Sequence, residues 1–325
     1  MTLAKRLKSS VSNLAQGVVG VAAGLALVFA IAGAPAQAWA QVAPAPAAAP
    51  AATPAIQGQG PALWVIKDAD STLYLFGTVH VLRPTVGWLS PKVEAAFDSS
   101  DQIWFEFSNP DDQAAVMAVI QQHGYSSDRP LSSYLTADER IGLEAAAASI
   151  GVAAEAMEPM RPWWAGMTLA LAPLAKAGYD PMSGSERILK ARADAAGKPS
   201  HGFETIEQQV RVLADLPEAV QVDLVREGIT DYQRGAEMLD GLVDAWAKGD
   251  VKALEAITVA EMKADFPALY GPLIVDRNTD WADQIQTQLQ GSGTAFIAVG
   301  AAHLTGDDSV QSILKSRGVA VESVE

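Results

Sequence analysis

Two apolar segments near opposite ends of the chain each end in the pattern Gly-x-x-His. The first, STLYLFGTVHVL, contains Gly77 and His80, and the second, TAFIAVGAAHLTG, contains Gly300 and His303. Short apolar runs bounded by turn residues are typical of buried strands. If the two strands are neighbours that run in the same direction, both histidines lie at one edge of one sheet. The pattern therefore predicts a fold in which the two ends of the chain meet.

The first part of the predicted folded region alternates strands with a short helix. The segments ALWVI and TLYLF flank the turn-rich link KDADS, which predicts a β-hairpin. A short helix is expected in SPKVEAAFDSS, with Ser90 as its N-cap and Pro91 at its first position. The alternating segment QIWFEF, residues 102–107, predicts another strand.

The middle of the chain, from about residue 111 to 290, has mostly helical periodicity. It includes a capping box from Thr136 to Glu139, a short strand in PSHGFE and a helix expected over 279–290. The last part contains a buried strand, a helix in DDSVQSILKSRG that starts at aspartate, and a final strand in VAVESV. We therefore expect an α+β protein with α/β-like ends. Its central mixed β-sheet is built from the N- and C-terminal segments, with a large helical region in the middle.

The N-terminus has the composition of a secretory signal peptide over residues 1–40. A basic start precedes an apolar run over 17–33, and APAQAWAQ then offers small-x-small cleavage sites after Ala38 or Ala40. We expect cleavage, and hence export to the periplasm or the extracellular space. The alternative is an uncleaved membrane anchor, for which the apolar run is only marginally long.

Composition limits the remaining possibilities. Residues 41–60 are rich in Ala and Pro and cannot bury a core, so we interpret them as an extended linker before one folded unit, 61–325. The chain has no cysteine, which excludes disulfides, thiolate metal sites and a cysteine nucleophile. Its net charge of −15 argues against nucleic acid as a partner, and membrane contact is expected only through an uncleaved signal. No feature of the sequence defines an oligomeric state.

Glu106 adds a carboxylate to the two histidines. It lies within the apolar strand segment IWFEFSN, where burial of a carboxylate without a partner is costly. A buried Glu106 would need a metal ion, an arginine or a protonated histidine. The alternative is a glutamate on the solvent face of an edge strand.

Two histidines and one carboxylate suit two kinds of chemistry. His80, His303 and Glu106 could ligate a divalent metal ion such as Mn, Co or Zn, which would lower the pKa of a bound water. They could also act without a metal, with an imidazole as general base for water and the carboxylate orienting it. The residues alone leave both open. The other two histidines, His123 and His201, have no comparable context and are interpreted as structural.

Several motifs together resemble the TraB/GumN family, which includes the TIKI proteases. They are LYLFGTVHVL, WFEF, FETIEQQ, VDRNTDWA and, most specifically, FIAVGAAHLTGDDSVQSILKSRGVAVE. The resemblance extends over about residues 61–325. It implies a fold similar to that of erythromycin esterase and ChaN-like proteins. The TIKI members are metal-dependent proteases, so the resemblance implies an exported metal-dependent hydrolase, and above all a peptidase, that acts on a peptide or small-molecule substrate.

The resemblance also implies site residues. The paired Gly-x-x-His motifs and the glutamate are the active site of the family, and this assigns catalytic and metal-ligating roles to His80, Glu106 and His303. Residues expected to line the cofactor position are Gly77, Gly300 and Asn278.

Four further residues occupy positions of interest in the family pattern. Arg277 and Asn278 stand at its Arg-Asn position, and Arg277 could hold a carboxylate or stabilise an oxyanion. The alternative for Arg277 is a structural salt bridge. Glu186 stands where the family usually has an aspartate. Glu204 could join the site, but we expect it to cap the following helix.

Two other functions fit the same residues. The protein could be a non-catalytic periplasmic binding protein whose pocket holds a peptide, a metal ion or haem. It could also be a metal-free esterase that acts through His80 and Glu106.

Overall fold

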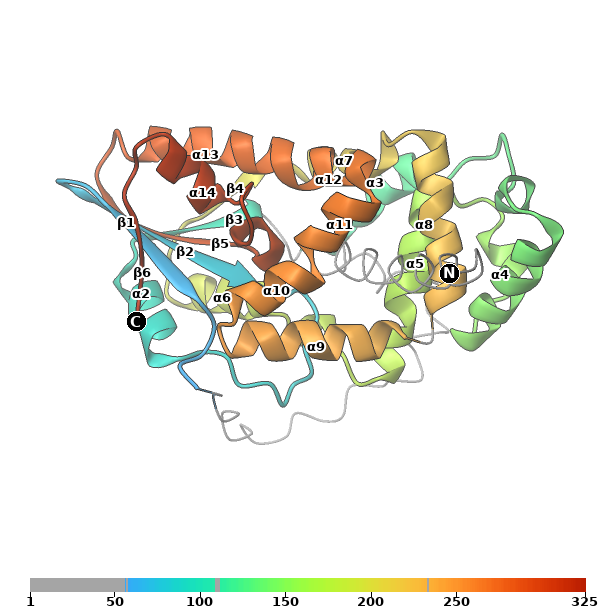
Figure 1. Ribbon diagram of the computed structural model, residues 1–325, viewed down its shortest axis with the longest axis horizontal. Helices are drawn as coiled ribbons and strands as arrows, with labels where there is room; N and C mark the ends of the chain where they lie inside the picture. Colours follow the sequence, from blue (N-terminus) through green and yellow to red (C-terminus); the bar gives the residue numbers. More distant parts are fainter. Residues whose placement is uncertain (1–55, 57, 109–111, 233) are drawn as a thin grey trace, which may run out of the picture.

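Both ends of the chain contribute strands to one mixed sheet (Figure 1). The computed structural model describes residues 56, 58–108, 112–232 and 234–325. Within these ranges six strands are ordered β4-β3-β5-β2-β1-β6. Their bounds are β1 (Leu63–Lys67), β2 (Ser71–Thr78), β3 (Gln102–Phe107), β4 (Ser200–Glu204), β5 (Gly293–Gly300) and β6 (Val321–Ser323).

The strand pairing confirms the predicted sheet. β1 and β2 form the expected antiparallel hairpin, and β6 pairs antiparallel with β1. β2 lies parallel to β5, β5 parallel to β3, and β3 parallel to β4. The C-terminal ends of β2, β3, β4 and β5 therefore lie at the same edge of the sheet.

Helices account for most of the rest of the described chain. Near the sheet lie α2 (Pro91–Ser99), α6 (Ser185–Ala195), α13 (Asp276–Gln288) and α14 (Val310–Ser316). The helical lobe beyond the strand ends contains α3 (Gln113–His123), α4 (Ala137–Ser149), α5 (Pro162–Lys176), α7 (Ile206–Ala214), α8 (Glu218–Asp231), α9 (Gly235–Ala247), α10 (Val251–Ile257), α11 (Val259–Asp265) and α12 (Pro267–Tyr270).

Helix ends mostly follow the predicted signals. α2 begins at Pro91 after Ser90, and the capping box from Thr136 to Glu139 makes both of its hydrogen bonds. Two expectations were wrong. α13 begins at Asp276, upstream of the predicted residue 279, because a π-helical turn leads directly into it. The N-cap of α14 is Ser309, whose hydroxyl accepts from a backbone N–H, and not an aspartate.

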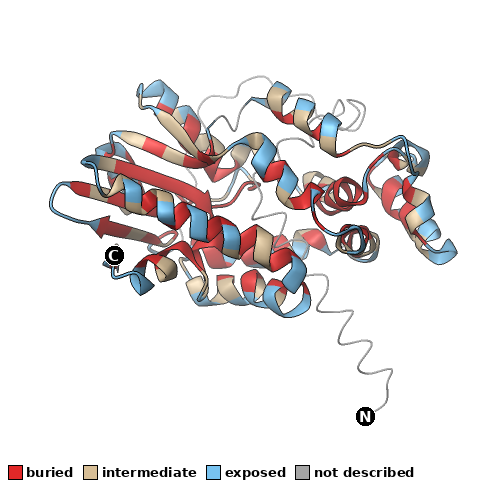
Figure 2. Cartoon of the chain, turned by 90° about the horizontal axis from the view of Figure 1, so that it is seen from above, coloured by how far each residue is buried: buried red, intermediate tan, exposed pale blue. Residues whose placement is uncertain are grey.

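Apolar side chains cover both faces of the sheet, which Figure 2 shows as buried strands beneath partly exposed helices. On one face, alternate strand residues such as Leu75 and Ile297 pack against Trp281 of α13 and Leu314 of α14. On the other face the core continues from Phe296 without a break into the helical lobe. The sheet and the lobe therefore share one core.

The predicted signal peptide, 1–40, and most of the predicted linker, 41–60, lie outside the described residues. The described end of the linker already contacts the fold, because Ile56 forms a parallel bridge with Gly87. None of the helices in the described ranges has the length and apolar character needed to cross a membrane.

Candidate active site

The two Gly-x-x-His turns lie side by side at the C-terminal edge of β2 and β5. Thr78 is opposite Gly300 in the register of the two strands. A Cβ atom on Gly77 would lie 3.0 Å from the Cα atom of Ala301, so a glycine is needed for the turns to approach each other. Neither glycine has a positive φ, and Gly300 has φ −50° and ψ 135°, so the close approach of the turns and not an unusual backbone conformation requires glycine at position 77.

Glu106 is fully buried in β3, beside β5, and its carboxylate has three donors. Oε1 accepts the backbone N–H of Gly300 at 2.8 Å. Oε2 accepts Nε2 of Gln209 at 2.6 Å and Nη2 of Arg277 at 2.7 Å. These bonds offset the cost of removing a carboxylate from water. The alternative of a glutamate on a solvent-exposed face is therefore wrong.

His80 lies between two carboxylates and is fully buried. Its Nδ1 is 2.6 Å from Oε2 of Glu186, and its Nε2 is 3.9 Å from Oε1 of Glu106. The contact with Glu186 is close but not aligned as a hydrogen bond, so we treat it as an ion pair. Burial alone would lower the pKa of His80, but the negative charges of Glu186 and Glu106 outweigh it and raise this pKa above 6.5.

Helix α6 carries Glu186 to His80 through a close backbone contact. A Cβ atom on Gly184 would lie 2.3 Å from the carbonyl oxygen of His80, so only a glycine allows the helix to begin there. The Ser185 hydroxyl accepts the N–H of Val79 at 2.9 Å and fixes the same junction. Glu186 is fully buried and contacts His80. It stands where the family pattern has an aspartate, whose side chain is one methylene shorter.

Hydrogen bonds determine which ring nitrogen of His303 carries the proton. The Asn278 amide nitrogen faces the backbone oxygens of Asp308, at 2.7 Å, and His303, at 3.4 Å. Oδ1 of Asn278 therefore faces Nδ1 of His303, at 2.6 Å, and accepts a hydrogen bond from the N–H at this position. Nε2 of His303 keeps a lone pair, to which Nη1 of Arg277 donates at 3.0 Å.

Arg277 links the histidine to two glutamates. Besides Glu106, it donates to both carboxylate oxygens of Glu204, from Nε at 2.8 Å and from Nη2 at 3.0 Å. Burial opposes the charge of the guanidinium, but Glu204 and Glu106 outweigh it and raise the pKa of Arg277. The expectation that Glu204 caps the next helix was wrong. Thr205 is the N-cap of α7, and Glu204 points to Arg277 and Trp281.

The donor set suits a metal ion in kind but does not fit one as the side chains lie. Nε2 of His80 and Nε2 of His303 lie 3.9 and 4.0 Å from Oε1 of Glu106, and Nδ1 of His303 donates to Asn278, as metal-ligating histidines do through their second nitrogen. However, the lone pair of His303 and Oε2 of Glu106 are both taken by Arg277. Among the described residues, no group of three or more His, Asp or Glu side chains is arranged to hold a metal ion.

Polar atoms without aligned partners gather at the end of β2. Within the described chain they include Oγ1 of Thr78, both ring nitrogens of His80 and both carboxylate oxygens of Glu186. Most buried polar atoms in proteins have partners, so such a group marks a place of function or of bound water. Arg277 and Glu204 are the outer members of the site, since their side chains are 5% and 9% exposed.

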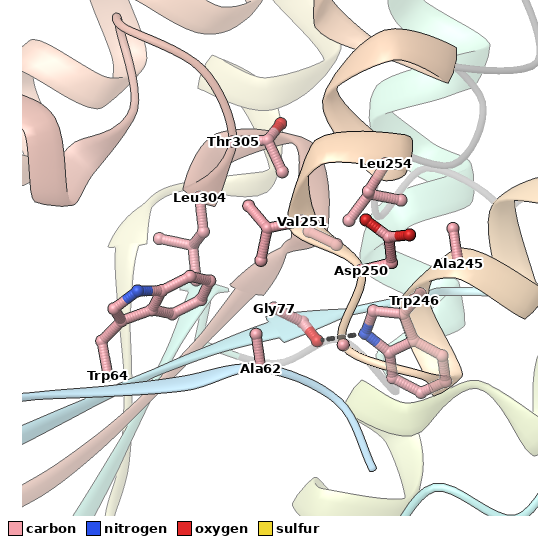
Figure 3. Close-up of a pocket in the computed structure, with 12 residues that line it drawn as sticks. Ala62, Trp64, Gly77, Ala245, Trp246, Asp250, Val251, Leu254, Leu304 and Thr305 are labelled. Carbon is pink, nitrogen blue, oxygen red and sulfur yellow. Dashed lines mark hydrogen bonds between the residues drawn. The ribbon is translucent and has the colours of Figure 1, made fainter. Parts of the chain in front are cut away.

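A small apolar pocket borders the two turns, as Figure 3 shows for Gly77 and Leu304. Gly77, Leu304 and Thr305 contribute to its lining, together with Trp64 and Trp246, and Nε1 of Trp246 donates to the carbonyl of Gly77 at 2.7 Å. The imidazoles and carboxylates of the site are not part of this lining. A molecule in the pocket would contact the backbone of the turns and not the reactive groups.

The remaining histidines lie away from the site. Nε2 of His123 is 3.6 Å from Oε1 of Glu207, and His201 stacks on Trp104 with 4.9 Å between ring centroids. Two contributors were missed from sequence. Gln209 binds Glu106, and Trp281 packs on His303 at 4.5 Å. Both lie within the motifs FETIEQQ and VDRNTDWA, which were their only signal.

The model of the TraB/PrgY/gumN family matches residues 62–323, which is most of the chain and all of the site. The chain belongs to the TraB/PrgY/gumN family. A family relative from Treponema pallidum (strain Nichols), an uncharacterized protein, is 22% identical over 267 residues, covering 78% of this chain and 80% of the relative.

Uncharacterized protein YbaP of Escherichia coli (strain K12) is 21% identical over 257 residues, covering 78% of this chain and 92% of YbaP. YbaP of Shigella flexneri has the same identity and coverage. No solved structure matches the chain.

Proposed function

We propose that this TraB-family protein is a hydrolase that cleaves a peptide or ester bond with His80 as general base. One observation carries the proposal. A fully buried imidazole has its Nδ1 against the carboxylate of Glu186, and its Nε2, without an aligned partner among the described residues, faces Glu106. A carboxylate–imidazole pair of this kind orients the ring and stabilises the charge that it gains when it takes a proton.

The proposed reaction starts from neutral His80, the form present above its raised folded-state pKa. A water bound to Nε2 of His80 and Oε1 of Glu106 gives its proton to His80 as it attacks the carbonyl carbon. The 3.9 Å between Nε2 of His80 and Oε1 of Glu106 is too long for a direct hydrogen bond, and a water molecule can bridge the two atoms. The same proton then passes from His80 to the leaving amine or alcohol. Glu186 holds the ring in place and balances its charge during both transfers.

Arg277 would stabilise the oxyanion of the tetrahedral intermediate. Its guanidinium is fixed by Glu106 and Glu204 before the reaction, so little reorganisation is needed when the charge develops. The site residues are almost fully buried, so the substrate reaches them only when the elements above the strand ends move apart. Arg277 and Glu204 mark the side from which a substrate would approach.

A divalent metal ion held by His80, Glu106 and His303 is the second candidate. The orientation of both Nε2 atoms toward one carboxylate oxygen favours it. In this version Arg277 has to leave His303, and the ion would supply Lewis acidity and an activated water. Both candidate mechanisms are compatible with export, because the predicted signal peptide takes no part in either of them.

The test is hydrolysis of a peptide pool and a panel of chromogenic esters by the mature chain, with and without a chelator. We expect activity that persists after chelation and falls about 10²–10⁴-fold in His80→Ala. The exposed substitution Lys248→Ala serves as a control and should leave the activity unchanged. A chain that binds peptide or haem but hydrolyses nothing in either panel would be a binding protein instead.

A further inference from the structure

Arg277 contacts two of the three residues that would hold a metal ion. Its Nη1 is 3.0 Å from Nε2 of His303, and its Nη2 is 2.7 Å from Oε2 of Glu106. A bound metal ion would need the lone pair on Nε2 of His303, and it would bind the carboxylate of Glu106 whose charge Arg277 already neutralises. The orientation of the Asn278 amide already fixes His303 in the tautomer that a metal ligand requires, with the proton on Nδ1.

The charge of the guanidinium is permanent. Glu204 and Glu106 raise the pKa of Arg277 further, so the group does not become neutral in the folded protein. A divalent ion next to His303 would lie beside this charge in a buried place, where repulsion between like charges is strong. The bidentate pairing with Glu204 holds the guanidinium in position.

We propose that Arg277 is a built-in cation that occupies the metal position between Glu106 and His303 and excludes divalent metal ions from the site. In the native site the guanidinium neutralises the negative charge of the glutamates. Replacing Arg277 with a neutral side chain therefore creates a metal site. Glu106 and His303 supply the ligands, and Glu204, once released, supplies a second carboxylate. The inference concerns the same site as the proposed hydrolase, but its test measures metal binding and not hydrolysis.

The experiment is titration of the mature chain with Co²⁺, followed by visible absorption and calorimetry. We expect no stoichiometric Co²⁺ binding in the wild type. Arg277→Met should bind Co²⁺ at least about tenfold more tightly than the wild type. The gain should disappear in Arg277→Met/His303→Ala. The matched control Arg129→Met removes an arginine that pairs with Glu218 at the surface and should behave as the wild type.

Arg277→Met leaves two buried carboxylates without their cation, so this variant could fail to fold without metal. The double variant Arg277→Met/Glu204→Gln removes both charges of the Arg277–Glu204 ion pair, and its Co²⁺ affinity can be measured in the same way. Arg277→Lys keeps the charge and should still exclude Co²⁺.

Two results would overturn the inference. One is stoichiometric Co²⁺ binding by the wild type, and loss of this binding in His303→Ala would assign it to the site. The other is a folded Arg277→Met that binds Co²⁺ no better than the wild type. Absence of hydrolysis in the wild type would count against the proposed function alone.

Discussion

A hydrogen bond from Nδ1 fixes the orientation and the tautomer of His303. Asn278 accepts this bond, and its amide links Nδ1 of the ring to the backbone of Asp308. In Asn278→Leu the ring nitrogen loses its acceptor, and a buried donor without a partner costs about 1–3 kcal/mol. We expect a matching loss of unfolding free energy and a population of the other tautomer, measured by denaturant titration and by ¹⁵N NMR of His303. Unchanged ring ¹⁵N shifts would contradict the assignment.

The charge of His80 gives stability a defined dependence on pH. The pKa of His80 is raised in the folded state, whereas an unfolded histidine titrates near pH 6.5. The stabilisation from protonated His80 is therefore fully present below pH 6.5 and is lost as the pH rises through the folded-state pKa. The difference in unfolding free energy between wild type and His80→Gln should shrink as the pH rises above 6.5. A difference that is constant across this range would show that His80 is neutral in the fold.

At the scale of elements, the approach of the β2 and β5 turns decides the geometry of the site. In Gly77→Ala the new methyl group would lie 3.0 Å from the backbone of Ala301, so the turns have to separate. We expect a loss of stability of about 1–3 kcal/mol and weaker hydrolysis. Gly241→Ala in α9 is the matched control, because its methyl group meets nothing within 4 Å and helix propensity should add about 0.5–1 kcal/mol. In thermal unfolding, the melting temperature should fall in Gly77→Ala and rise in Gly241→Ala.

At the scale of the whole molecule, the two C-terminal strands contribute unequally to the sheet, because β5 is central and β6 lies at an edge. A chain that ends at residue 318 loses β6, a three-residue edge strand paired with β1, together with its flanking residues, and should fold with a lower melting temperature. A chain that ends at residue 292 loses β5, which lies between β2 and β3 in the centre of the sheet. We expect it not to fold, as judged by near-UV circular dichroism. Native-like spectra from the shorter chain would mean that the lobe folds without the sheet.

The sequence alone determined the local features. Alternation and turn residues specified the hairpin, the strand at 102–107 and the capping box at Thr136, because these depend on neighbours within a few positions. The matched Gly-x-x-His turns also predicted that two parallel strands meet. The start of α13 and the cap of α14 were missed, since neighbouring residues supply competing caps and a continuous turn there.

Only the tertiary structure decided the partners of the buried charges. Glu204 had a plausible local role as a cap, but burial beside Arg277, 73 positions away in sequence, made the ion pair the more favourable use of its charge. Glu186 reaches His80 because Gly184 lets α6 begin against the turn, a contact that spacing along the chain does not reveal. Local patterns are set by short-range sterics and hydrogen bonds, whereas a buried charge is paired by whichever opposite charge the fold brings within reach.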